Sequence, residues 1–286
     1  MSSNASKISK ISKISKKISI ISFNGLMMLV SLVALFPLIW MLSVSSMAPG
    51  EASSYPPPLL PRHPDLSNYI ELFSHAGIGT YFLNSVMLSS AATIMALIFN
   101  VTAGYAFAKL EFTGKERIFK LLLAALVIPG QVAMLPLFLI LKNMGLLNTY
   151  FGVLIPTMAS IFSIFLVRQY AISIPTTLIE AARIDGANEF RIFFSIVLPG
   201  LTPILVTLAI FTFLGTWNDF MWPLIVLSDQ HLYTLPLALA ALSREHVQDN
   251  EMMMAGSVLT VLPVLFLFLG LQRFYMQGLM VGSVKG

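Results

Sequence analysis

Six long stretches of this sequence contain no Asp, Glu, Lys or Arg, and they limit the fold more than any other feature. A helix needs about 20 mostly apolar residues to cross the hydrocarbon core of a bilayer. The chain is 57% hydrophobic and only 10% charged, whereas a soluble domain has roughly 25% charged residues. The sequence therefore predicts an all-α integral membrane protein with six transmembrane helices. The charge-free runs are Ile18–Gly50, Leu72–Ala108, Leu121–Leu141, Asn143–Val167, Ile192–Asn218 and Met252–Gln272.

Proline and small residues inside these runs indicate where helices bend and where they contact one another closely. Prolines inside the runs either kink packed helices or act as hinges, and Pro129-Gly130 is the leading hinge candidate. The small residues 89–92 and Ala103-Gly104 favour close contact between helices. Helices are expected near residues 23–45, 80–106, 119–141, 151–170, 196–224 and 254–274.

The distribution of positive charge predicts the orientation. An even number of spans puts both termini on one side of the membrane. With both termini inside, fourteen Lys and Arg residues are cytoplasmic and only Arg62, Lys142 and Arg244 are outside. Cytoplasmic loops carry such an excess. We therefore expect cytoplasmic termini and a cytoplasmic loop 171–195.

The segments outside the core differ in composition. Residues 1–20 repeat Lys-Ile-Ser and are expected to be a disordered, basic cytoplasmic tail near anionic headgroups, or else a specific lipid- or protein-binding segment. Residues 21–79 contain the first transmembrane helix and a proline-rich outer loop. The transmembrane core covers 80–276, with a second outer loop at 229–251. Residues 277–286 form a cytoplasmic C-terminal tail.

A polar stretch between two spans, residues 174–188, has the pattern of a short helix and a sharp turn. Pro175 suits the first helical position, where its missing N–H is not needed. A helix of eleven residues would be about 16 Å long. Gly186 is placed to end the helix in a left-handed conformation, and Asn188 is placed to cap the next helix.

Motifs for catalysis and nucleotide binding are absent from the sequence. The only Gly-Lys pair, at 114–115, lacks the upstream glycine of a P-loop. The chain has no cysteine and no metal-binding or nucleophile motif. We therefore predict no catalytic residues, no metal site and no enzyme activity, and we expect another chain to handle ATP.

The sequence resembles the permease subunits of carbohydrate ABC importers of type I, the maltose and glycerol-phosphate permease family. Glu180-Ala-Ala182, then Asp185-Gly-Ala187 and Ile196-Val-Leu-Pro199, are similar to the EAA loop of that family. Further matches are Val127–Gln131, Gly145–Tyr150, Gly215–Pro223 and Val281–Gly286. The resemblance implies a type I importer permease fold. It assigns coupling to the ATPase to Glu180, Ala181, Ala182, Ile184, Asp185 and Gly186.

The same resemblance implies the partners and the location. The partners would be a second homologous permease, two ABC ATPase subunits, an extracytoplasmic solute-binding protein, membrane lipid and a sugar, with no nucleic acid. No cofactor would bind to this chain, since ATP and Mg²⁺ would bind to the ATPase subunits. The chain would be a multi-pass protein of a bacterial or archaeal plasma (inner) membrane. Transport would proceed by alternating access.

Several polar and aromatic residues in or near the spans are candidates for a translocation path or gate. They either line a pathway or serve as interfacial and interhelical groups: Trp217, Asn218, Asp219, Gln131, Asn100 and Asn84. Two alternative functions remain open, namely an ABC importer of a non-sugar solute such as glycerol phosphate or a polyol, and a secondary transporter. The spans lack the carboxylate and histidine chain that a proton-coupled carrier needs.

Overall fold

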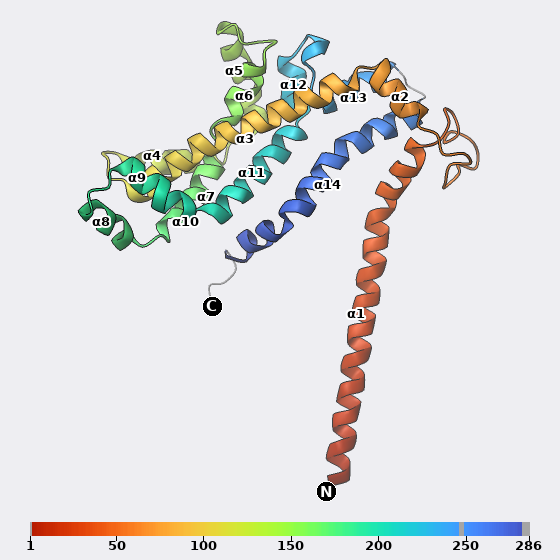
Figure 1. Cartoon of the computed structure of the whole chain (residues 1–286), viewed down its shortest axis with the longest axis horizontal. Helices are drawn as coiled ribbons and strands as arrows, with labels where there is room; N and C mark the ends of the chain where they lie inside the picture. The colour runs from red at the N-terminus through yellow and green to blue at the C-terminus, as the bar shows by residue number, and fades with distance from the viewer. Residues whose placement is uncertain (1, 246–248, 282–286) are drawn as a thin grey trace. The chain divides into compact units, whose positions relative to one another are not determined.

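The computed structural model describes residues 2–245 and 249–281, and the side chains of 20–243 and 249–272. All regular structure within these residues is helical, which confirms the all-α prediction (Figure 1). The elements are α1 Ser2–Ser45, α2 Ser67–Ser74, α3 Ile78–Lys109, α4 Lys115–Ala125, α5 Gly130–Asn143, α6 Tyr150–Leu154, η1 Ile155–Thr157, α7 Ile161–Ile172, α8 Thr176–Ile184, α9 Glu189–Ile192, η2 Phe193–Val197, α10 Leu198–Gly200, α11 Thr202–Trp217, α12 Met221–Val226, η3 Gln230–Leu232, α13 Leu235–Glu245 and α14 Asn250–Val281.

The six apolar runs become three long helices and three bent helix pairs. Ile20–Ser45, Ile78–Lys109 and Asn250–Gln272 are each long and apolar enough to cross a membrane. The bent pairs are α4 with α5 at 106°, α6–η1 with α7 at 42°, and α9–α10 with α11 at 78°. If each bent pair is one span, the described residues contain up to six spans.

The prediction of continuous helices near 119–141, 151–170 and 196–224 is wrong. Pro129 caps α5 and Pro156 lies in η1 between α6 and α7. Pro199 follows the π-helix η2, and α11 ends at Trp217, before the separate helix α12. At these three prolines the missing N–H and the clash of the ring with the preceding turn interrupt the helix or change its pitch, whereas Pro37, Pro136 and Pro263 lie within continuous helices. The hydropathy pattern does not reveal such breaks, because a proline adds no charge and the run stays apolar.

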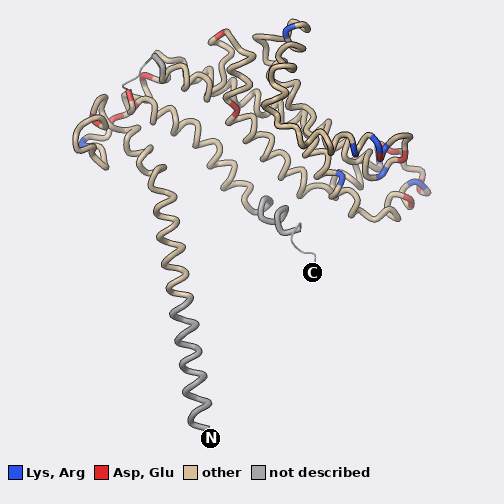
Figure 2. Tube along the Cα trace, turned by 180° about the vertical axis from the view of Figure 1, so that it is seen from behind, with Lys and Arg blue, Asp and Glu red and all other residues tan. Residues whose placement is uncertain are grey.

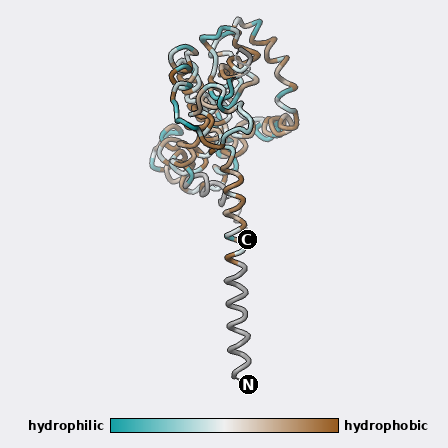
Figure 3. Tube along the Cα trace, turned by 90° about the vertical axis from the view of Figure 1, so that its right-hand side faces the viewer, coloured by the Kyte–Doolittle hydropathy of each residue, from teal (hydrophilic) through white to brown (hydrophobic). Residues whose placement is uncertain are grey.

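The chain forms two compact units, and the first contains Met1–Glu71 and Val247–Val258. Residues 20–39 of α1 are all exposed, and this part of the helix is largely hydrophobic (Figure 3). The loop after α1 is ordered by side chains: Asn68 Nδ2 donates to the carbonyls of Ser45 and Met47, at 3.1 and 2.8 Å. The Ala52 N–H donates to Glu251 Oε1 at 2.7 Å.

The second unit contains Leu72–His246 and Leu259–Gly286 and is built around α3. Helices α7 and α11 both pack along α3 (Figure 1). The predicted close contact at Ala103-Gly104 is confirmed. A Cβ added to Gly104 would lie 2.5 Å from both Cβ and Cγ1 of Val167 in α7, so only glycine allows this approach of the two helices.

Charged side chains gather at one end of the second unit. Figure 2 shows Lys, Arg, Asp and Glu concentrated around α4, α8 and α9, while most of α3 and α11 has none. One buried cluster lies at this end and includes Val101, Tyr105, Val167, Ile179 and Ile192. The polar segment 174–188 packs against this cluster.

Three further expectations are corrected. The basic N-terminal segment is helical from Ser2, since a helix already nucleated in the apolar run extends through Lys and Ile at little cost. The segment 229–251, expected to be an outer loop, contains η3 and α13, because Leu235, Leu237 and Ala238 bury one face of a helix. Helix α14 continues to Val281 into the expected C-terminal tail, whereas 282–286 lie outside the described residues.

Candidate functional site

The segment between α7 and α9 carries the predicted coupling residues, and its helix is shorter than expected. Helix α8 has nine residues, Thr176–Ile184, and is about 13.5 Å long. Pro175 precedes it as the N-cap, with ψ at 128°, and is not the first helical residue. The chain before Pro175 is fixed by Lys109 of α3, whose Nζ donates to the carbonyls of Ile172 at 3.3 Å and Ile174 at 2.6 Å.

The end of α8 has the left-handed glycine that the sequence predicts. Gly186 has φ at 79°. Its N–H donates to the Arg183 carbonyl at 3.0 Å, and the Ala187 N–H donates to the Ala182 carbonyl at 2.9 Å. These two bonds are the pair that defines a Schellman motif. They satisfy two of the last carbonyls of α8 and fix the direction in which the chain leaves the helix.

The next helix begins as predicted at Asn188. The Asn188 Oδ1 accepts a hydrogen bond from the Arg191 N–H at 2.8 Å. The stretch from Glu189 onward then runs through the π-helix η2 into α10. The change of pitch precedes Pro199, which has no N–H to continue an α-helical ladder. The left-handed Gly186 and the capping Asn188 together therefore end α8 and start the next helix.

Only one side of α8 packs on the protein. Ile179 is 1% exposed and lies in the buried cluster with Val101, Tyr105 and Ile192. Ala182 is half-buried and contacts the same cluster. The coupling candidates Glu180, Ala181, Ile184, Asp185 and Gly186 are exposed. Of the six residues named from the resemblance, five therefore face away from the protein.

The exposed side of α8 also carries large apolar residues, of which the sequence reasoning named only Ile184 as a coupling candidate. Ile184 is 87% exposed, Leu178 is 53% exposed, and Phe190 at the start of α9 is 76% exposed. The sequence does indicate this second apolar side. Leu178 and Ile179 are adjacent, and adjacent residues of a helix point in different directions. A short helix with apolar residues on both its packed and its exposed side indicates a second packing partner.

A polar contact joins α8 to α9 and to α3, and the sequence reasoning missed it as well. Arg183 Nε donates to Glu189 Oε1 at 2.8 Å, and the Tyr105 hydroxyl donates to Glu189 Oε2 at 3.3 Å. The hydrogen bond and the negative charge of Glu189 raise the pKa of Arg183. Nothing in the sequence separates Glu189 from the other charged residues of this loop, because Tyr105 lies 84 positions away.

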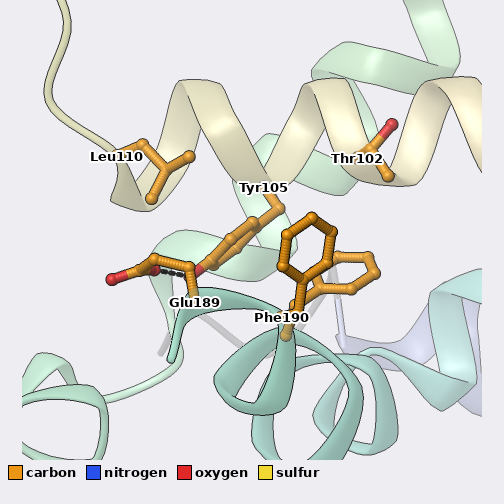
Figure 4. A pocket seen from close by; sticks show the side chains of 6 residues that line it. Thr102, Tyr105, Leu110, Glu189 and Phe190 are labelled. Carbon is orange, nitrogen blue, oxygen red and sulfur yellow. Dashed lines mark hydrogen bonds between the residues drawn. The ribbon is translucent and has the colours of Figure 1, made fainter. Parts of the chain in front are cut away.

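The Tyr105–Glu189 contact borders a small pocket (Figure 4). The pocket has a volume of about 220 Å³ and opens between the end of α3 and the start of α9. Phe193 lies beside Tyr105, with ring centroids 5.3 Å apart. The lining side chains are Thr102, Tyr105, Leu110, Glu189, Phe190 and Phe193.

Three of the residues predicted for a translocation path or gate make contacts inside the chain. Trp217 is fully buried between Phe82 and Phe213, and its Nε1 donates to the Thr260 carbonyl at 3.0 Å. Further contacts tie α3 to its neighbours. Asn100 Oδ1 accepts from the Ser160 N–H at 2.8 Å, and Asn84 Nδ2 donates to the carbonyls of His231 and Tyr233.

Of the other three residues of that set, Asn218 and Gln131 are exposed and Asp219 is half-buried. Asn218 is exposed and donates to the Leu214 carbonyl of its own helix at 2.9 Å. Asp219 Oδ1 accepts from the Trp222 N–H at 3.3 Å, near the start of α12. Gln131 is exposed in the first turn of α5. A pathway role stays a prediction for all six residues.

Comparison with known proteins identifies the protein's relatives. The family model described as "Binding-protein-dependent transport system inner membrane component" matches residues 100–280. The chain is 42% identical over 222 residues to the arabinooligosaccharides transport system permease protein of Halalkalibacterium halodurans, covering 77% of this chain and 80% of that protein. It is 37% identical over 241 residues to the diacetylchitobiose uptake system permease protein of Streptomyces coelicolor, covering 83% and 80%.

A solved structure has the same fold. A chain of a bacterial ABC transporter involved in the import of the acidic polysaccharide alginate superposes with a TM-score of 0.82 at 25% identity. The match covers 91% of this chain and 98% of that chain. The likeness therefore extends well beyond the segment around α8 to nearly the whole helical arrangement.

Proposed function

The chain belongs to the family of binding-protein-dependent transport system inner membrane components, and from this we propose that it imports a sugar or oligosaccharide as the permease subunit of an ATP-driven ABC importer. The observation that carries this proposal is the likeness to sugar permeases over about four-fifths of the chain. The chain is an integral membrane protein of the inner membrane, and its relatives are transporter subunits and not enzymes.

In the proposed complex, this chain pairs with a second homologous permease, two ATPase subunits and an extracytoplasmic solute-binding protein. ATP and Mg²⁺ bind to the ATPase subunits, and this chain binds neither. The exposed side of α8 supports this arrangement, because Leu178, Ala181 and Ile184 offer an apolar contact beside the carboxylate of Glu180. An ATPase that covers this side would bury apolar surface and gain a charge-assisted contact.

The proposed mechanism is alternating access driven through α8. Closure of the ATPase dimer displaces α8, and Ile179 carries the displacement into the cluster formed by α3, α7 and α11. The Schellman turn at Gly186 and the cap at Asn188 hold α8 and α9 in a fixed relation, so the segment moves as a lever. The bends next to Pro129 and Pro199 are the proposed hinges.

The proposal is tested by reconstituting the complex with its partners in proteoliposomes. We expect ATP-dependent uptake of arabinotriose or diacetylchitobiose when the solute-binding protein is present. Uptake of glycerol 3-phosphate alone would instead support import of a non-sugar solute, and uptake without ATP would indicate a secondary transporter.

Purified alone, the chain is expected to hydrolyse no ATP above a blank, because its sequence contains no P-loop. The co-purified complex should hydrolyse ATP faster when solute-loaded binding protein is added. The measurement is phosphate release at matched protein concentration. Sustained hydrolysis by the isolated chain, surviving removal of contaminants by a second affinity step, would contradict the permease assignment.

Single cysteines test the proposed orientation, since the chain has no cysteine of its own. Ser243 in α13 and Thr177 in α8 are both exposed. In intact cells, an impermeant maleimide should label Ser243→Cys and not Thr177→Cys. Opening the membrane should make both react equally, which controls for accessibility. Labelling of Thr177→Cys in intact cells would reverse the orientation.

A further inference from the structure

Helix α8 has one fully buried side chain, Ile179, and half-buried Ala182 packs against the same cluster. Ile179 lies in the first half of α8 and packs into the cluster with Tyr105 and Ile192. Ile179 and Ala182 are three positions apart, so both contacts lie on the same side of α8. A polar contact nearer the C-terminal end of α8 would be a second point that constrains its direction relative to α3.

The contacts around Glu189 provide such a second point. Arg183 lies one residue before the end of α8, and its Nε is 2.8 Å from Glu189 Oε1. The other oxygen of the same carboxylate accepts from Tyr105 of α3 at 3.3 Å. The three side chains form a series, Arg183 to Glu189 to Tyr105, with Glu189 common to both contacts.

The surroundings of this series leave room for it to rearrange. The pocket of about 220 Å³ borders Tyr105 and Glu189, so this side of the junction between α3 and α9 is not close-packed (Figure 4). The Tyr105 contact is longer than the roughly 2.7–2.8 Å that is common for O–H···O bonds, whereas the Arg183 contact, at 2.8 Å, has the usual length of a charge-assisted bond. The contact to α3 is therefore the longer of the two contacts in the series.

We propose that the Arg183–Glu189–Tyr105 series transmits the position of α8 to α3, with Glu189 as its positioning residue. This inference rests on the proposed function in taking α8 as the segment moved by the ATPase. It adds three residues that lie outside the Glu180–Gly186 motif. Breaking the series at either contact should leave the complex assembled and hydrolysing ATP, while less of the hydrolysis drives solute movement.

The test measures the number of solute molecules imported per ATP hydrolysed by the complete complex in proteoliposomes. The probe is whichever of arabinotriose and diacetylchitobiose the wild-type complex imports faster. Tyr105→Phe removes only the hydroxyl that contacts Glu189, and Arg183→Met keeps the stem but removes every donor. We expect each change to lower the ratio by about fivefold, the lower end of common coupling effects.

Two further comparisons distinguish a transmitting series from separate structural contacts. Because the contacts act in series, the double variant Tyr105→Phe/Arg183→Met should lose no more than either single variant. Glu189→Gln keeps an acceptor oxygen and should retain most of the ratio, whereas Glu189→Ala should match the other losses. Glu116→Gln is the matched control, since Glu116 faces Arg168 at 3.7 Å at the same end of the unit but is not in the series.

Each outcome decides a different question. Wild-type ratios in Tyr105→Phe and Glu189→Ala would overturn the proposal, and so would additive losses in the double variant. Reduced co-purification of the ATPase with Glu189→Ala would also overturn it, because the residue would then serve assembly. If the wild-type complex imports glycerol 3-phosphate and neither sugar, or imports solute without ATP, the proposed function itself fails.

Discussion

Replacing Gly186 by valine is expected to abolish uptake while the protein still reaches the membrane in normal amounts. Gly186 has φ at 79°, a left-handed conformation that a β-branched residue adopts at a cost of about 1–2 kcal/mol or more. A Cβ at this position would meet nothing within 4 Å, so the cost arises from the backbone and not from a clash. The strain is relieved when the turn after α8 opens, and this displaces the exposed side of α8.

The measurement combines membrane abundance, co-purification of the ATPase and uptake. Gly186→Asn is the matched control, because Asn tolerates the left-handed region and should retain most of the uptake. Glu180→Ala should have a milder effect than Gly186→Val, since it removes one charge-assisted contact of roughly 1.5–3 kcal/mol and leaves the turn unchanged. Normal uptake by Gly186→Val would show that this turn does not transmit force.

Replacing Gly104 by valine is expected to have the opposite pattern, with loss of the folded protein itself. The added Cβ would lie 2.5 Å from Val167 Cβ and Cγ1 and 3.1 Å from the Arg168 nitrogen. Part of this obstacle is backbone, so α3 and α7 must separate along their contact. Overpacking of a close-packed interior costs about 1–3 kcal/mol, and a forced backbone shift adds to that cost.

Membrane abundance and the thermal stability of the detergent-purified complex measure this effect. Gly215→Ala in α11 is the matched control, because it also adds a side chain to a helical glycine but meets nothing within 4 Å. Gly104→Ala should lie between the control and Gly104→Val. If Gly104→Val accumulates to the wild-type level with an unchanged melting temperature, the close contact of α3 and α7 is not needed for folding.

Gly186 and Gly104 differ in how much of their role the sequence alone predicts. Gly186 was predicted from its place after a run of helix-forming residues and before the cap Asn188, and both features are present. Gly104 was predicted as one member of a small-residue pair, but its partner Val167 was not identified. A turn depends on neighbours in sequence, whereas a helix contact depends on residues that are distant in sequence.

The charge-free runs, the all-α class and the polar segment with its turn signals were determined by the sequence alone. These features depend on transfer of apolar residues out of water and on local backbone preference, both of which are properties of short segments. The nine-residue length of α8, the 106° bend between α4 and α5 and the helix α13 depended on packing. The roles of Glu189, Trp217 and Asn100 depended on packing as well. Each of these side chains contacts a residue of another helix or, for Asn100, the residue that caps another helix. Only the tertiary structure determines which distant donor or acceptor a buried polar group finds.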